Sequence, residues 1–171
     1  MKQKQKIDFV INTLLIIIGI SILILSLFNF EIKYLFMGTL GLYGILNLIQ
    51  FILSKKSLDY EGLYTFLASI AILLMTYFLY HGSSLTLALL ILGWTTIMAV
   101  IKFIKTDYYN DRRDRMWKIR IFTLVVFIIT GIISSILIIN KGNSLMVVGY
   151  FFFIHGILEL VDPITKYLLS K

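Results

Sequence analysis

Six long apolar stretches constrain this chain more than any other feature of its sequence. An α-helix needs about 20 mostly apolar residues to cross the hydrocarbon core of a bilayer. Backbone groups in lipid must be hydrogen-bonded within their own segment, so each stretch of this kind predicts a membrane-spanning helix. The stretches cover approximately residues 9–28, 34–53, 63–80, 84–104, 120–139 and 145–164.

The composition fits a membrane protein and excludes several kinds of chemistry. Apolar residues make up 59% of the 171 residues and charged residues only 15%, whereas a soluble domain holds about 25% charged residues. The chain has no cysteine, which excludes disulfides, thiolate catalysis and cysteine-bound metals. No connection is long enough to hold a soluble domain, so we expect residues 1–171 to form a single membrane domain.

The basic residues predict the orientation of the chain. Of the 16 Lys and Arg residues, Lys33 and Lys141 lie in connections on one side, and all others lie on the opposite side. Lys and Arg favour the cytoplasmic side, so both termini are expected in the cytoplasm. The N-terminus is basic and then apolar, like a signal peptide, but its apolar run is long and no small-residue cleavage site follows. We therefore expect a retained first helix.

The same charges bear on partners. The net charge of +7 comes from residues beside the apolar stretches, so we expect the lipid bilayer as a partner and no nucleic acid. Residues 105–120 form the most highly charged connection, with six basic and three acidic residues. Basic residues near a membrane attract anionic lipid heads by about 1 kcal/mol each. This connection predicts contact with anionic lipids, or alternatively a solvated signal that only sets topology.

The apolar stretches also fall into three similar hairpins, over approximately residues 9–54, 61–106 and 119–168. A shift of 52 positions places Gly41 on Gly93 and "IQFI" on "IKFI". A further shift of 60 positions places "GSSL" on "GNSL". Gap-free matches of this kind indicate an internal repeat. The predicted fold is therefore an all-α, six-helix integral membrane bundle built from three transmembrane helical-hairpin repeats.

Small residues recur at matching places in these hairpins. Helices in lipid associate by close packing of their backbones, which small residues permit. We interpret these residues as helix-packing positions; the alternative is that they are hinges of a moving transporter. The predicted packing residues are Gly19, Gly38, Gly41, Gly44, Ala71, Gly93, Gly131 and Gly156.

Three ionisable residues lie on one face of the last helix. His155, Glu159 and Asp162 are four and three positions apart, which places them on one stripe of an α-helix. Pro163 follows this stripe, and the residue before a proline disfavours helix, so we expect the helix to end or kink there. The repeat alignment gives the stripe polar counterparts in the other two hairpins. The predicted polar cluster, on the cytoplasmic side, contains His155, Glu159, Asp162, Asn47, Gln50 and Lys102.

The sequence allows three interpretations of this stripe. The first is a structural charge cluster, the second is a pocket that senses protons or binds a small molecule, and the third is part of a transport path. The stripe continues outward through Phe151 and Val148, which are apolar, and this favours a cluster or an inward-opening pocket over a pore. His155 and Glu159 would offer only two metal ligands, and the other histidine, His81, lies in an outer turn, so no metal site is predicted.

We found no catalytic motif and no cofactor-binding motif in the sequence. An enzymatic interpretation rests only on the neighbouring His155 and Glu159, so we expect a non-enzymatic protein with no catalytic residues and no cofactor. The alternative to a structural protein is a small proton-linked transporter or channel that uses the stripe of His155, Glu159 and Asp162.

The second helices of the three hairpins read "GLYGILNLIQF", "GWTTIMAVIKF" and "IHGILELVDP", and each first helix has a small residue midway. Together with the three tandem hairpins, these features resemble the HdeD-like family over approximately residues 9–168. The resemblance implies a small, multi-pass protein of the bacterial cytoplasmic membrane. Because the founding member is linked to acid resistance, it also implies a role in acid or envelope stress. A homo-oligomer is compatible with such a bundle.

Overall fold

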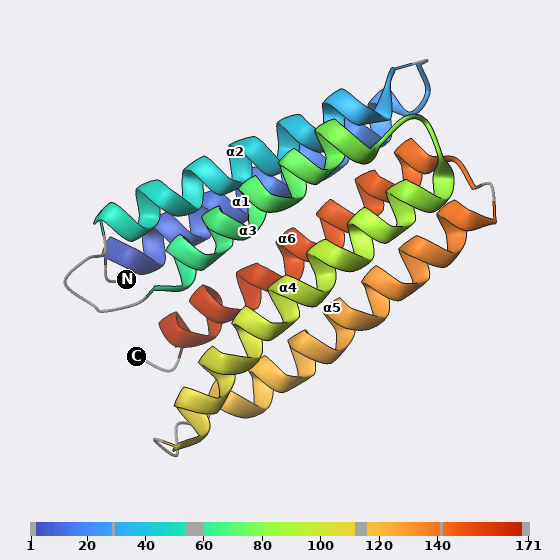
Figure 1. Cartoon of the computed structure of the whole chain (residues 1–171). Helices are drawn as coiled ribbons and strands as arrows, with labels where there is room; N and C mark the ends of the chain where they lie inside the picture. Colours follow the sequence, from blue (N-terminus) through green and yellow to red (C-terminus); the bar gives the residue numbers. More distant parts are fainter. Residues whose placement is uncertain (1–2, 29, 54–59, 112–115, 141, 169–171) are drawn as a thin grey trace.

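The computed structural model describes residues 3–28, 30–53, 60–111, 116–140 and 142–168. Within these ranges the chain forms α-helices joined by short turns and no strands, so the all-α prediction is confirmed (Figure 1). The six helices are α1 (Gln3–Leu25), α2 (Ile32–Leu53), α3 (Glu61–Leu79), α4 (Ser84–Asp111), α5 (Met116–Ile139) and α6 (Ser144–Leu168).

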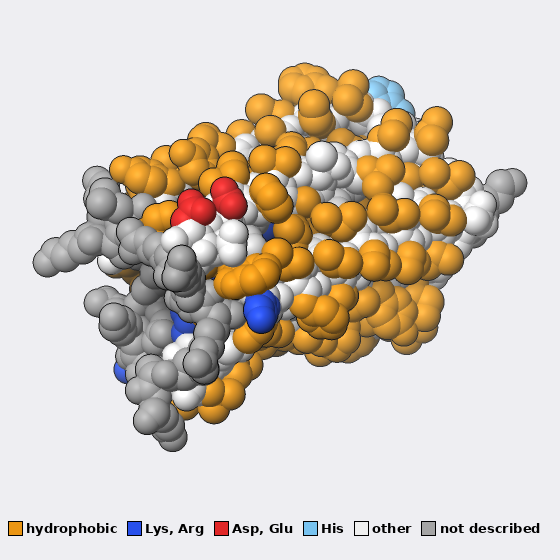
Figure 2. All heavy atoms as spheres, turned by 90° about the horizontal axis from the view of Figure 1, so that it is seen from below, with side chains coloured by type: hydrophobic (Ala, Val, Ile, Leu, Met, Phe, Trp, Pro, Cys, Tyr) orange, Lys and Arg blue, Asp and Glu red, His pale blue; other side chains and the backbone are white. Residues whose placement is uncertain are grey.

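All six helices are long and apolar enough to cross a membrane. Hydrophobic side chains cover most of the face seen in Figure 2, and the charged side chains visible there gather toward one end. An apolar outer surface is what a lipid environment requires, since the hydrocarbon core solvates apolar side chains and excludes charge. The prediction of six apolar helices of membrane-spanning length is therefore confirmed.

Two helices run further than the sequence suggested. Residues 105–111 belong to α4 and residues 116–120 belong to α5, so a loop over the whole of residues 105–120 was a wrong expectation. Residues 112–115, which carry three of its arginines, lie outside the described residues. The last helix also continues through Pro163 to Leu168, so of the two expectations, an end or a kink at this point, the end was wrong. Packing of α6 outweighs the local preference of the residue before proline.

The helices form a closed ring in which each helix contacts the next one along the chain and α6 returns to α1. The most extensive contacts join α1 to α6, α4 to α5, and α2 to α3. The contacts between α1 and α2, α3 and α4, and α5 and α6 are smaller. Each helix therefore packs most closely against a helix of a neighbouring hairpin. The start of α1 and the end of α6 lie at the same end of the helix bundle, which we call the terminal end (Figure 1).

Glycine sets the distance between helices in the three most extensive contacts. A Cβ atom on Gly19 would lie 2.5 Å from the backbone nitrogen of Phe153, between α1 and α6. One on Gly44 would lie 2.8 Å from Ser69 Cβ, between α2 and α3. Gly131 on α5 meets Thr95 on α4 equally closely. Bulkier residues at these places would force the helices apart.

The other predicted packing residues divide into two groups. Gly156 approaches α1 closely, and a Cβ atom on Gly41 or Gly93 would meet its neighbour at an ordinary contact distance of 3.4 Å. Gly38 and Ala71 are exposed, and a Cβ atom on Gly38 would meet nothing within 4 Å. The packing role expected of these last two residues is wrong, because they lie on helix faces that no other helix covers.

The half of the bundle away from the terminal end has an apolar core. Phe36 and Phe152 lie 5.9 Å apart between ring centres, and Phe151 and Phe152 lie 5.5 Å apart. Large apolar side chains of α2, α4 and α6 are fully buried around them. The buried residues include Leu40, Leu87, Ile91, Trp94 and Val148.

Candidate functional site: a polar pocket at the terminal end

Polar side chains from all six helices line one pocket in the half of the bundle nearer the terminal end. The helices α1, α2 and α3 contribute mainly oxygen-bearing groups, such as Asp8, Asn47 and Glu61. The helices α4, α5 and α6 contribute the cations Lys102, Lys105, Arg120 and Lys166 together with the carboxylates Glu159 and Asp162. The lining holds four carboxylates and four cations, so its formal charge is balanced.

The structure brings together the six residues that the sequence assigned to a polar cluster. Asn47, Gln50, Lys102, Glu159 and Asp162 all line the pocket. His155 lies beside its inner end and is only 1% exposed, and its Nε2 atom is 4.0 Å from Glu159 Oε1. The stripe on α6 therefore faces the interior of the bundle.

Three ion pairs hold the charges of the pocket. Lys102 pairs with Glu159, Lys105 with Glu61, and Arg120 with Asp162. In each pair both side chains are largely buried, with no more than 23% of either exposed. Charges in such surroundings are costly unless they are paired and hydrogen-bonded. The ion pairs therefore explain how this part of the bundle tolerates so many ionised groups.

Amide side chains complete the lining. Gln50 donates a hydrogen bond to the Asp8 carboxylate, which joins α2 to α1. The Asn12 side chain donates to the backbone oxygen of Glu159 at 3.2 Å and so ties α1 to α6. Asn47 donates to the backbone oxygen of Tyr43 at 2.8 Å, within α2. Every helix of the ring thus has a polar contact near the pocket.

Two contacts near the terminal end lie at positions that the predicted repeat relates. Asp8 and Gln50 in the first hairpin correspond to Arg120 and Asp162 in the third, each by a shift of 112 positions, and both pairs join the two helices of their own hairpin. In the second hairpin, Lys105 and Glu61 join α4 to α3 from other positions, since Lys102 and Tyr60 occupy the corresponding ones.

Lys102 is the residue that departs from this arrangement. It occupies the repeat position of Gln50 and Asp162, but it pairs with Glu159 on α6 instead of a residue on α3. Of the three ion pairs, Lys102–Glu159 is the one that joins two different hairpins. It therefore links α4 to α6 across the bundle.

His155 occupies an unusual environment. Its ring centre is 5.7 Å from that of Tyr43 and 4.7 Å from that of Phe127, and the ring stacks on Phe151 at 10°. Neither ring nitrogen has a hydrogen-bond partner among the described residues. A buried polar group without a partner costs about 1–3 kcal/mol. A histidine in this state needs an explanation beyond packing.

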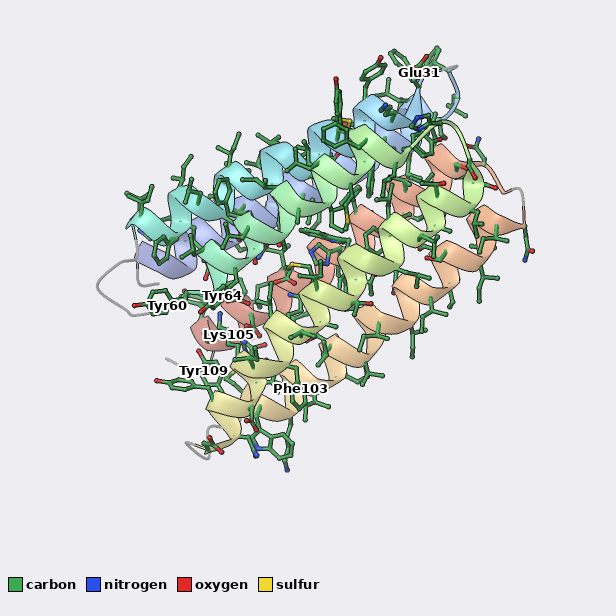
Figure 3. The ribbon with its side chains drawn as sticks, in the orientation of Figure 1. Glu31, Tyr60, Tyr64, Phe103, Lys105 and Tyr109 are labelled. Atoms are coloured by element: carbon green, nitrogen blue, oxygen red, sulfur yellow. The ribbon has the colours of Figure 1, made fainter. Side chains whose placement is uncertain are left out.

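An aromatic side chain packs against two basic residues of the pocket lining. The Arg120 guanidinium lies over the Tyr109 ring, 4.7 Å from its centre, and Lys166 Nζ donates a hydrogen bond to the Tyr109 hydroxyl at 2.9 Å. Figure 3 shows Lys105 and Tyr109 at the terminal end, far from Glu31. Arg120 and Lys105 belong to the connection that was expected either to contact anionic lipid or to act as a solvated topology signal, but these two side chains turn into the bundle and pair with carboxylates.

The space in the pocket is small. It measures about 40 Å³, and a smaller space of about 20 Å³ adjoins it beside Thr106 and Thr123. A water molecule needs at least about 10–15 Å³ on this scale, whereas pockets for drug-sized ligands span about 300–1,000 Å³. The pocket therefore has room for a few water molecules, and Glu159 is one of its lining residues. Across the described part of the chain, no group of three or more His, Asp or Glu residues is placed to hold a metal ion.

Sequence reasoning missed four of the pocket's charged residues: Asp8, Glu61, Lys105 and Arg120. The last two were interpreted only as part of a basic connection that either contacts anionic lipid or sets topology. The repeat alignment contained a usable signal, because Asp8 and Arg120 occupy one repeat position and lie opposite Gln50 and Asp162. Glu61 and Lys105 have no such signal, since their pairing depends on how α3 meets α4.

The fold and the pocket define a class of protein: a multi-pass, α-helical membrane protein with a buried charge cluster at one end. Comparison of the chain with protein-family models, with curated proteins and with solved structures finds no match. The function is therefore argued from the pocket itself.

Proposed function

We propose that this chain is a non-enzymatic membrane protein of HdeD-like type, located in the bacterial plasma membrane, and that its polar pocket serves survival under acid or envelope stress. The observation that carries the proposal is the set of paired charges buried inside a bundle of membrane-spanning helices. Ionisable residues inside a membrane domain are costly, and they usually mark a functional site.

Stability alone is a poor reason to keep such a cluster. Replacing a buried ion pair by apolar residues of similar volume is often neutral or even stabilising, so a bundle that only needed to fold would do as well without these charges. Two of the three ion pairs join helices that are already consecutive in the chain, and Lys102–Glu159 adds a contact between hairpins. This supports a working role for the pocket.

The orientation supports a pocket that exchanges with the cytoplasm. The pocket lies toward the terminal end, on the side that carries all the Lys and Arg residues except Lys33 and Lys141. By the preference of these residues for the cytoplasmic side, water and protons reach the pocket from the cytoplasm. The apolar core around Phe36 and Phe152 closes the other side.

A deletion experiment tests this function. We expect deletion of the gene to lower survival after acid shock or after envelope stress, and the wild-type gene to restore survival. Glu159→Gln should fail to restore it at equal abundance in the membrane, whereas Gly38→Ala, a change on an exposed helix face, should restore it fully. Unchanged survival of the deletion strain under both stresses would refute the proposal.

A second candidate function is a small proton-linked transporter. The observation that favours it is the pair of His155 and Glu159 at the inner end of a pocket that reaches one side only, as expected for one state of an alternating-access cycle. Proteoliposome flux assays with the wild type, Glu159→Gln and His155→Ala test it. An absence of flux across a broad panel of substrates would eliminate this candidate.

A further inference from the structure

One carboxylate oxygen lies between two basic side chains in the pocket. Glu159 Oε1 is paired with Lys102 Nζ, and the same oxygen is 4.0 Å from His155 Nε2. Lys102 holds the carboxylate, and His155 has no hydrogen-bond partner within the described chain. Glu159 therefore has a second partner within reach that it does not use in this state.

The other charged groups around His155 are already engaged. The helices packed against α6 or facing the pocket present these titratable or charged groups: Asp8 on α1, Tyr43 on α2, Glu61 on α3, Lys102 and Lys105 on α4, and Arg120 on α5. On α6 itself they are Glu159, Asp162 and Lys166.

Among the carboxylates, Asp162 pairs with Arg120, and Asp8 accepts a hydrogen bond from Gln50. Glu61 pairs with Lys105. Glu159 is the carboxylate within 4.0 Å of the His155 ring among the described residues.

We infer that His155 and Glu159 form a proton-binding site whose occupancy breaks the Lys102–Glu159 ion pair. A proton from water in the pocket adds to the His155 ring nitrogen that lacks one, so that both ring nitrogens carry hydrogen. The imidazolium is surrounded by the rings of Phe127 and Phe151 and needs a counter-charge. Glu159 supplies it by turning from Lys102 to His155, and water in the pocket then hydrates the Lys102 ammonium.

This exchange acts on one contact in the bundle. Lys102–Glu159 joins the second and third hairpins, whereas Glu61–Lys105 and Arg120–Asp162 each lie within one hairpin. Proton binding therefore loosens α4 from α6 and leaves the two intra-hairpin pairs intact. The result is a wider pocket. The inference rests on the pocket being the working part of the protein, as proposed above, and it names the ligand of that pocket as a proton.

The absence of cysteine makes this opening measurable. Met98 lines the pocket from α4 and is 2% exposed, so Met98→Cys places a single thiol where a charged, water-soluble thiol reagent reaches it only when the pocket opens. Ser83→Cys, in an exposed turn, reports the intrinsic pH dependence of thiol reactivity. Both proteins are labelled as purified full-length chains in detergent, from about pH 7.5 to about pH 5.

We expect the ratio of the two labelling rates to rise as pH falls, by up to about tenfold for each pH unit, because one proton controls the opening. In the Met98→Cys background, His155→Phe should make the ratio independent of pH, with His155→Leu as a second variant in case the first is not monodisperse. Glu159→Gln should give a high ratio at every pH. His81→Phe, at the other histidine, should leave the pH profile unchanged.

A ratio that does not change with pH in the wild-type background, or a pH dependence that survives both His155 replacements, would overturn the inference. This outcome is separate from the survival test. Lower survival of the deletion strain together with a labelling ratio that does not change with pH would retain the proposed function and reject the proton site. Unchanged survival together with a labelling ratio that rises as pH falls would reject the proposed function and retain the proton site.

Discussion

Lys102 and Glu159 face each other across the boundary between the second and third hairpins, with side chains that are 15% and 18% exposed. In the closed pocket that the structure describes, each ion depends on the other, because neither side chain is exposed enough for water alone to stabilise its charge. The backbone oxygen of Glu159 also accepts a hydrogen bond from Asn12, which holds this turn of α6 against α1. The hydrogen bond from Asn12 thus fixes the backbone at Glu159, and the two opposite charges of Lys102 and Glu159 neutralise each other.

A double-mutant cycle tests this mutual dependence. We expect Lys102→Met to lower the free energy of unfolding by about 3–5 kcal/mol, since it leaves Glu159 buried and unpaired. Lys102→Met combined with Glu159→Gln should recover most of this loss, because no net charge then remains. Reversible unfolding in mixed micelles measures both values. If the double variant were no more stable than Lys102→Met alone, the two side chains would not depend on each other.

At the level of the helices, the close approach of one helix to another depends on a few glycine residues. Gly131 on α5 lies against the side chain of Thr95 on α4, and Gly19 on α1 lies against the backbone of Phe153 on α6. These contacts lie between hairpins, where the helices pack most extensively. Because lipid offers no hydrophobic gain for burying an apolar side chain, this fit of surfaces contributes most of the association.

Gly131→Ala and Gly38→Ala form a matched pair for this argument. The new methyl group at position 131 would overlap the Thr95 side chain, so we expect a loss of about 1–3 kcal/mol from overpacking. At position 38 the methyl group meets nothing within 4 Å, and alanine should stabilise the helix by up to about 1 kcal/mol over glycine. Thermal unfolding in detergent measures the difference. Equal effects at the two sites would contradict the packing role of Gly131.

The helices could be predicted from the sequence because a membrane-spanning helix requires a long apolar segment, as in α5 and α6. The stripe of His155, Glu159 and Asp162 could also be predicted, because spacings of four and three residues place side chains on one face of any α-helix. The partners of these residues were not readable. Whether Arg120 reaches lipid or Asp162 depends on how α5 rotates against α6, and that rotation is set by packing across the whole ring.

At the scale of the whole molecule, one half of the described bundle is rich in buried charge and the other half has an apolar core. Charged pairs and the pocket gather near the terminal end, and buried aromatic rings fill the half toward the turns at residues 26–28 and 80–83. A proposed cytoplasmic position of the terminal end would give the charged half access to the compartment where Lys and Arg are favoured. The apolar half would then lie on the outer side and act as a seal.

Labelling in intact cells tests this orientation. We expect a membrane-impermeant thiol reagent to modify Ser83→Cys from outside the cell, because this turn is exposed and lies on the side that the distribution of Lys and Arg predicts to face outward. Lys118→Cys, an exposed position at the start of α5 on the opposite side, should be modified only after the cells are opened. The reverse pattern would invert the topology and would place the pocket on the outer side.

If the three hairpins are a true repeat, as the sequence predicts, the polar contacts of two hairpins should be interchangeable. Gln50 donates to Asp8 in the first hairpin, and Arg120 pairs with Asp162 at the same repeat positions in the third. Gln50→Asp alone should place two carboxylates side by side and destabilise the protein, because like charges at short range repel in buried surroundings. Adding Asp8→Arg should recreate the arrangement of the third hairpin and restore much of the stability.

Thermal unfolding of the two variants in the same detergent measures this recovery. A similar swap between unrelated helix pairs would not be expected to succeed, because the side chains would meet at a different height and angle. If the double variant were less stable than Gln50→Asp alone, the first and third hairpins would not share one geometry at their terminal ends. The correspondence between Asp8 and Arg120 would then be a coincidence of numbering.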